Sequence, residues 1–108
     1  MWFIFPQLAG LGHSPIARYY ALASLAEAET YLAHPVLGPR LIECAELVNQ
    51  IEGRPVAAIF GSPDDLKFHS SMTLFSFAAP DTFVFRQALT KYFNGLNDPL
   101  TTRLLFQR

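Results

Sequence analysis

The chain has 108 residues, the length of a single domain. Its formal net charge is -1, so it lacks the excess positive charge that attracts nucleic acid or anionic lipid. Its single cysteine, Cys44, cannot form an internal disulfide, and no apolar run approaches the roughly 20 residues of a membrane helix. We therefore expect one domain over residues 1–108, located in the cytoplasm, without a nucleic-acid or membrane partner.

The N-terminal stretch begins with large apolar side chains and has no polar lead-in. Because Pro6 disfavours helix at the residue before it, Trp2–Gln7 is predicted to be irregular or extended and to lie across helices. A β-strand is the alternative, but the sequence offers no convincing second strand to pair with it. A flexible loop, Ala9–His13, follows. The pair Ser14-Pro15 then combines a capping residue with a proline suited to a first helical turn, which predicts a short helix over Pro15–Leu22.

Two helices are predicted in the next part of the chain. Ser24 and Glu27 have the spacing of a capping box, which opens a helix ending near Ala33. The longest surface helix is expected over Pro39–Glu52, with Gly53 as a left-handed cap. Apolar residues recur there at helical spacing and polar ones are expected to face water. The first set is Leu37, Leu41, Cys44, Ala45, Val48 and Ile51, and the second is Arg40, Glu43, Glu46, Asn49 and Gln50.

The C-terminal part carries further start and stop signals. Pro55–Phe60 is predicted to be a short helical turn stopped by Gly61. Asp81 is expected to cap a helix over Thr82–Phe93, which Asn94-Gly95 stops. The pair Asp98-Pro99 then starts a last helix over Leu100–Phe106.

The stretch Ser62–Ala79 is predicted to be the helix around which the others pack. Ser62 is a suitable N-cap, Pro63 suits the first helical position, and two aspartates follow where the helix dipole is positive. Beyond them the helix is apolar on two sides, which is typical of a buried helix. One stripe is Leu66, Thr73, Leu74 and Phe77, and the other is Phe68, Met72, Phe75 and Ala79. The fold class is therefore all-α: a compact orthogonal bundle of about five to six helices, one of which, at about residues 63–79, is central and buried and is surrounded by the others.

A glycine loop near the N-terminus is the first candidate site. Gly10, Gly12, His13 and Ser14 lead into a predicted helix that carries Arg18 one turn on. Free amides and a guanidinium there can bind a phosphate or a carboxylate. The alternative is a plain loop and helix cap, because no βαβ unit surrounds the glycines.

The first turns of the central helix form the second candidate site. Asp64 with Lys67, and Asp65 with His69, lie one turn apart, a spacing that suits acid–base chemistry in a cleft. The alternative is structural, since both aspartates favour the helix start and Lys67 pairs naturally with a residue three positions away.

The third candidate site surrounds the turn between the predicted helix that ends near Ala33 and the one that begins at Pro39. His34, Arg40 and Glu43, joined by His13, can hold an anion, although a histidine before a proline also simply ends a helix. The histidines lack ligand partners at metal-binding spacing, so no metal is predicted. Cys44 lies on a buried stripe, which argues against a nucleophile. No pattern in the sequence implies a cofactor.

Several long segments of the chain together resemble a known family. They are Trp2–Leu8 with Gly10–Ser14, Ala33–Leu41, Ile59–Lys67 and Ser70–Phe75. They are similar to a widespread bacterial family catalogued as a domain of unknown function, whose members often carry the label "calpastatin". The resemblance implies a small all-helical fold with one helix surrounded by the others and implies no established activity. The label conflicts with this composition, since inhibitors of that kind are disordered and polar.

The resemblance also indicates a difference at the N-terminus. Family members carry a further N-terminal segment with a helix and a basic stretch, whereas Met1 here begins in the middle of the pattern. Either the start codon is misassigned or a missing helix leaves an apolar groove. A second copy of the chain would fill that groove, which predicts a homodimer.

Two functional hypotheses follow. The first is a non-catalytic binding or interaction module, because the charge is near neutral and a buried core explains most motifs. The alternative is a small enzyme or binder of an anionic small molecule, such as a nucleotide or a phosphorylated sugar. Its polar residues would be Arg18, Arg40, His13, His34, Asp64 and Asp65, converging on one concave site.

Overall fold

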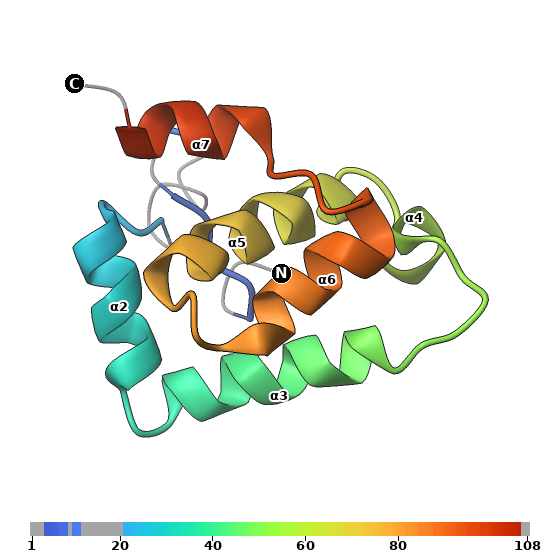
Figure 1. Ribbon diagram of the computed structural model, residues 1–108, viewed down its shortest axis with the longest axis horizontal. Coiled ribbons are helices and arrows are strands. Elements are labelled where there is room, and N and C mark those ends of the chain that lie inside the picture. Colours follow the sequence, from blue (N-terminus) through green and yellow to red (C-terminus); the bar gives the residue numbers. More distant parts are fainter. Residues whose placement is uncertain (1–3, 9, 12–20, 107–108) are drawn as a thin grey trace.

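Six α-helices follow one another in the described part of the computed structural model, which comprises residues 4–8, 10–11 and 21–106 (Figure 1). They are α2 Leu25–Ala33, α3 Leu37–Asn49, α4 Val56–Phe60, α5 Asp64–Ala78, α6 Phe83–Phe93 and α7 Pro99–Phe106. The only extended pairing among these residues is one isolated parallel bridge between Leu8 and Leu22. The predicted all-α class is confirmed.

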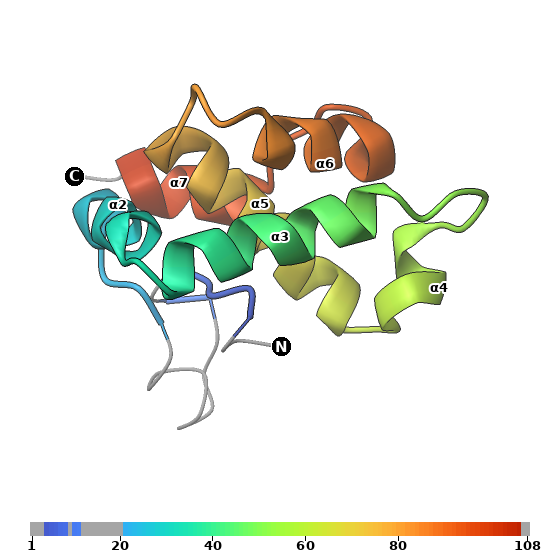
Figure 2. The same cartoon turned by 90° about the horizontal axis from the view of Figure 1, so that it is seen from below.

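Helix α5 lies at the centre of the bundle and packs against α2, α4, α6 and α7 (Figures 1 and 2). Its large side chains Phe68, Met72, Leu74 and Phe75 are completely buried. Helix α3 completes the bundle by packing against α2 and α6. The prediction of a central helix wrapped by the others is confirmed.

Small polar residues are also buried in α5. Ser70 Oγ donates to the Lys67 carbonyl at 3.0 Å, Thr73 Oγ1 to the His69 carbonyl at 2.9 Å, and Ser76 Oγ to the Thr73 carbonyl at 2.7 Å. Each of these three hydroxyls finds an acceptor in the preceding turn of its own helix, which removes most of the cost of burying it, whereas the buried Ser71 Oγ has no partner among the described residues.

Several helix boundaries agree with the sequence signals. Ser24 Oγ accepts the Glu27 amide at 3.2 Å at the start of α2. Gly61 ends α4 with φ 75°, and Asn94 ends α6 in the left-handed conformation. Asp98 caps the start of α7, where its side chain accepts the Thr101 amide at 3.0 Å.

Two expected capping residues do not have that role. Pro63 rather than Ser62 occupies the N-cap of α5, and no side chain caps the helix there. Backbone carbonyls accept some of the free amides of the first turn instead: the amide of Asp65 donates to the carbonyl of Gly61 at 2.9 Å. Thr82, not Asp81, is the N-cap of α6, again without a side-chain bond.

Helix α3 begins and ends earlier than predicted. It begins at Leu37 because the Nδ1 atom of His34 accepts the backbone amides of Val36 and Leu37, both at 3.1 Å. It ends at Asn49, so Gly53, with φ 72°, lies in the following loop. The expectation that Asn49 faces water is wrong, because its side chain is buried and Nδ2 donates to the Val84 carbonyl at 3.1 Å.

The N-terminal segment crosses the bundle as predicted over its described residues 4–8. The ring of Phe5 meets Phe60 and Phe68 edge-on, with centroids 6.0 Å and 5.0 Å apart. Leu22, the expected end of a short helix, is extended instead and donates its amide to the Gln7 carbonyl at 2.8 Å. Ala21 is not helical either, and the other residues of that predicted helix, 15–20, lie outside the described residues.

Candidate binding site

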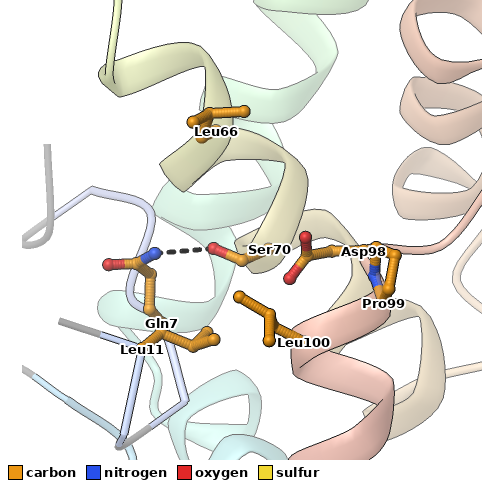
Figure 3. A pocket seen from close by; sticks show the side chains of 7 residues that line it. All are labelled: Gln7, Leu11, Leu66, Ser70, Asp98, Pro99 and Leu100. Atoms are coloured by element: carbon orange, nitrogen blue, oxygen red, sulfur yellow. Dashed lines mark hydrogen bonds between the residues drawn. The ribbon is translucent and has the colours of Figure 1, made fainter.

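A pocket opens between the N-terminal segment, the first turns of α5 and the start of α7 (Figure 3). Its volume is about 440 Å³. We call it the α5–α7 pocket and define it by Gln7, Leu11, Leu66, Ser70, Asp98, Pro99 and Leu100. Three segments far apart in the sequence therefore build one concave surface.

The apolar wall of the pocket is partly open to solvent. Leu66 is 62% exposed and Leu100 is 56% exposed. The prediction that Leu66 belongs to a buried stripe of α5 is wrong, because this position faces the pocket rather than a neighbouring helix. Two large leucines are thus left for a ligand or a partner to cover.

One polar contact joins the N-terminal segment to α5 across the pocket. Gln7 Nε2 donates to Ser70 Oγ at 2.7 Å, the bond drawn in Figure 3. The same hydroxyl donates onward to the Lys67 carbonyl at 3.0 Å. This chain of hydrogen bonds fixes the orientation of both side chains in the wall.

Asp98 supplies the carboxylate of the pocket and is held at three points. Its Oδ2 accepts the amide of Thr101 at 3.0 Å and the hydroxyl of Thr101 at 2.6 Å. Its own amide donates to Thr73 Oγ1 at 2.8 Å. Since a carboxylate is favoured at the positive end of a helix dipole, this geometry explains both why α7 starts here and why the carboxylate is fixed.

The loop before Asp98 is fixed by α5 and α6. The imidazole of His69 stacks on Phe93, with centroids 3.8 Å apart and planes at 4°, and Nε2 donates to the Leu96 carbonyl at 2.8 Å. Arg86 reaches the carbonyl of Gly95 at 3.3 Å and the side chain of Asn97 at 3.4 Å. His69, a sequence candidate for acid–base chemistry, therefore serves to hold this loop.

The other candidates on α5 lie close to the pocket but do not line it. Lys67 Nζ lies 3.3 Å from Asp64 Oδ1, which confirms the predicted pairing at a spacing of three residues. Asp65 Oδ1 is buried and has no hydrogen-bond partner among the described residues. A catalytic role for Asp64, Asp65 and His69 stays a prediction.

The candidates of the α2–α3 turn lie elsewhere. His34 caps α3, as described above, and Arg40 is exposed in the first turns of that helix. This turn and the first turn of α5 lie toward opposite ends of the molecule (Figures 1 and 2). His34 and Arg40 therefore do not converge with Asp64 and Lys67 on one cleft.

One phenol near that turn has a perturbed acidity. Burial raises the pKa of Tyr31 above its ordinary value, the Arg40 guanidinium opposes this shift, and Cys44 adds slightly to it. Tyr31 lies against Phe75 of the central helix, with ring centroids 5.8 Å apart.

The glycine-loop candidates lie almost entirely outside the described residues. These are Gly12, His13, Ser14 and Arg18. Gly10 is exposed with φ 99°, and an added Cβ would meet the side chain of Leu104 at 3.4 Å. The anion-binding role of this loop stays a prediction.

Sequence reasoning missed the pocket as a site. It identified Asp98 only as a helix start, and it placed neither Gln7 nor Leu100 in a site. No local signal marked Leu66, because its helical spacing to buried residues assigned it to a buried stripe, and Leu100 had no assigned role in the first turn of α7. No group of three or more His, Cys, Asp or Glu side chains in the described ranges is placed to hold a metal ion.

Comparison with known proteins gives a family and no activity. The family model described as "Protein of unknown function (DUF1810)" matches residues 1–105. The fold is similar to the crystal structure of the conserved hypothetical protein Rv1873 from Mycobacterium tuberculosis, with 55% sequence identity and a TM-score of 0.95. The match covers 96% of this chain and 74% of that chain. No curated protein matches the sequence. Among the described residues, no helix is long and apolar enough to cross a membrane.

Proposed function

Since the chain belongs to the DUF1810 family, whose function is unknown, we propose from the site itself that the protein is a non-catalytic binding module whose ligand occupies the α5–α7 pocket. The observation that carries the proposal is the make-up of this pocket. Leu11, Leu66, Pro99 and Leu100 form apolar walls around three polar residues, in a volume of about 440 Å³. Small-ligand sites have this combination and a volume of roughly 300–1,000 Å³.

The polar groups of the pocket support binding rather than catalysis. Ser70 Oγ accepts from Gln7 and donates to a backbone carbonyl, so it is not paired with a base that would activate it as a nucleophile. Asp98 uses one carboxylate oxygen to cap α7. These contacts fix the shape of the pocket, which lowers the entropic cost of binding a ligand.

A fragment screen followed by amide chemical shifts tests the proposal. We expect hits to perturb the amides of Leu11, Leu66, Ser70 and Leu100, and to lose affinity in the double variant Leu66→Gln/Leu100→Gln. Both leucines are more than half exposed, so this variant is expected to fold normally.

The matched control is Leu47→Gln, because Leu47 of α3 is 55% exposed and does not line the pocket. Fragments should bind this variant as they bind the parent chain. Hits that cluster elsewhere on the molecule, or that bind the double variant unchanged, would exclude the α5–α7 pocket as the binding site.

Self-association is the second candidate, and a specific observation favours it. Leu66, Leu96 and Leu100 are all more than half exposed, and they belong to the first turn of α5, the α6–α7 loop and the start of α7. A second copy covering these leucines would remove apolar area from water. Sedimentation velocity tests it: a dimer that Leu96→Gln dissociates is expected, and a monomer at all concentrations would rule it out.

A further inference from the structure

We infer that the α5–α7 pocket selects an organic cation, a ligand with an apolar body and a protonated amine. This inference rests on the proposed function, because it names the ligand class of the same site. Among the described residues that line the pocket, Asp98 is the one with a charged side chain. The pocket therefore combines apolar walls with a single carboxylate.

The carboxylate of Asp98 has an oxygen that can still accept a hydrogen bond from a ligand. Both of its side-chain hydrogen bonds, from the amide and the hydroxyl of Thr101, fall on Oδ2. Oδ1 has no hydrogen-bond partner in the described part of the chain. An ionised carboxylate offers about four acceptor positions, so an ammonium group can be added without breaking the cap of α7.

Contacts within the protein fix the position of this carboxylate before a ligand binds. Thr73 Oγ1 holds the amide of Asp98, and His69 and Arg86 hold the loop just before it. In Figure 3 the Asp98 side chain and the Gln7–Ser70 pair both border the pocket, with Leu66 above them and Leu100 below. A ligand amine would thus meet a fixed acceptor while its apolar part covers Leu66 and Leu100.

Neighbouring charge does not favour an anion instead. Lys67 Nζ is 3.3 Å from the carboxylate of Asp64, so its charge is already offset, and Lys67 does not line the pocket. An anionic ligand would face Asp98 with like charge. A charge-assisted hydrogen bond to Asp98 should make an amine bind about tenfold more tightly than an uncharged ligand of the same shape.

The experiment compares three probes of equal chain length by amide chemical-shift titration of the full chain at neutral pH. The probes are n-hexylamine, n-hexanol and hexanoate. We expect the amine to bind about tenfold more tightly than the alcohol and hexanoate to bind most weakly. The variant Asp98→Asn should bring the amine down to the level of the alcohol.

Asparagine is itself a good N-cap, so Asp98→Asn removes the charge while keeping the start of α7. Asp81→Asn is the matched control, because it makes the same change in net charge at an exposed residue outside the pocket. Thermal melts of both variants verify that they fold. The control should bind all three probes as the parent chain does.

The outcomes separate this inference from the proposed function. Equal binding of amine and alcohol, tighter binding of hexanoate, or an unchanged amine affinity in Asp98→Asn would each overturn the choice of a cation. If the probes still lose affinity in Leu66→Gln/Leu100→Gln, the pocket remains a binding site. Failure of hexylamine to bind at millimolar concentration also overturns the inference. The proposed function is decided separately, by whether the uncharged members of the fragment screen bind the pocket.

Discussion

The hydroxyl of Thr73, completely buried in the middle of α5, accepts the backbone amide of Asp98 at 2.8 Å while donating to the carbonyl of His69 at 2.9 Å. One core side chain thus joins the central helix to the residue that starts α7 and supplies the carboxylate of the pocket. The packing of the core and the shape of the pocket are linked through this contact.

Replacing Thr73 by valine is expected to destabilise the fold by about 1–2 kcal/mol, because the half-buried amide of Asp98 loses its acceptor while the side-chain shape is kept. Urea unfolding measures the change. Thr90→Val on the exposed face of α6 is the control and should change the free energy of unfolding by less than about 0.5 kcal/mol. Equal effects of the two substitutions would show that the Thr73–Asp98 bond contributes nothing.

Gly38 is buried in the first turn of α3, and an added Cβ would overlap the backbone carbonyl oxygen of Leu32. The backbone cannot move aside as a flexible side chain can. Gly38→Ala is therefore expected to lower the free energy of unfolding by about 3 kcal/mol or more. Gly53 has φ 72° with open space around its Cβ position, so Gly53→Ala should cost only about 1–2 kcal/mol. Thermal unfolding of the two variants makes the comparison, and the reverse order would contradict the close α2–α3 approach.

Side chains of α6 donate hydrogen bonds to carbonyls at the end of α3 and in the segment just after it. The Tyr92 hydroxyl donates to the carbonyls of Val48 and Ile51, and Lys91 Nζ donates to the carbonyl of Asn49. We expect Tyr92→Phe to lower the free energy of unfolding by about 1 kcal/mol, since these half-buried acceptors lose their donor.

The control for this substitution is Glu52→Gln. Glu52 lies 3.0 Å from Lys91 Nζ, but its side chain is 85% exposed, so the ion pair is screened by water. Chemical denaturation should detect almost no change for Glu52→Gln. A larger effect of Glu52→Gln than of Tyr92→Phe would mean that charge pairing, not the phenol hydrogen bonds, joins α3 to α6.

Stability should fall at high pH through Tyr31. Its pKa is raised chiefly by burial, so the folded protein holds the phenol proton more tightly than the unfolded chain does. The resulting stabilisation is complete below the ordinary tyrosine pKa of about 10 and is lost as the pH rises through the higher folded-state value. Urea unfolding of Tyr31→Phe and the parent chain from about pH 8 to 11 should show a shallower decline in the variant; identical declines would contradict it.

Local signals predicted the helices well, because the residues that start and stop them act on their immediate neighbours. Ser24, Gly61 and Asn94 have the expected roles at helix ends. The absence of a polar face in the body of α5 correctly indicated a buried helix. These features depend on spacing along the chain, which a sequence displays directly.

The errors arose where contacts between distant segments decide the outcome. Nothing near Asn49 in the sequence shows that the Val84 carbonyl will accept its side chain. Leu66 has helical spacing to buried residues, yet it faces an opening whose other walls come from Gln7 and Leu100. The sequence therefore predicted the elements of the pocket without predicting that they meet.

Because α5 packs against α2 and α4 before it and against α6 and α7 after it, its large aromatic side chains cannot all be covered until α6 has been made. Phe68 contacts Tyr92 and Phe93 of α6, and Phe75 contacts Phe85 of α6, so residues up to Phe93 must leave the ribosome before these rings are covered. Synthesis at about 5–20 residues per second therefore exposes Phe68 and Phe75 for a few seconds in every nascent chain. During that interval a chaperone or a neighbouring nascent chain competes with the protein's own last helices for the same surface.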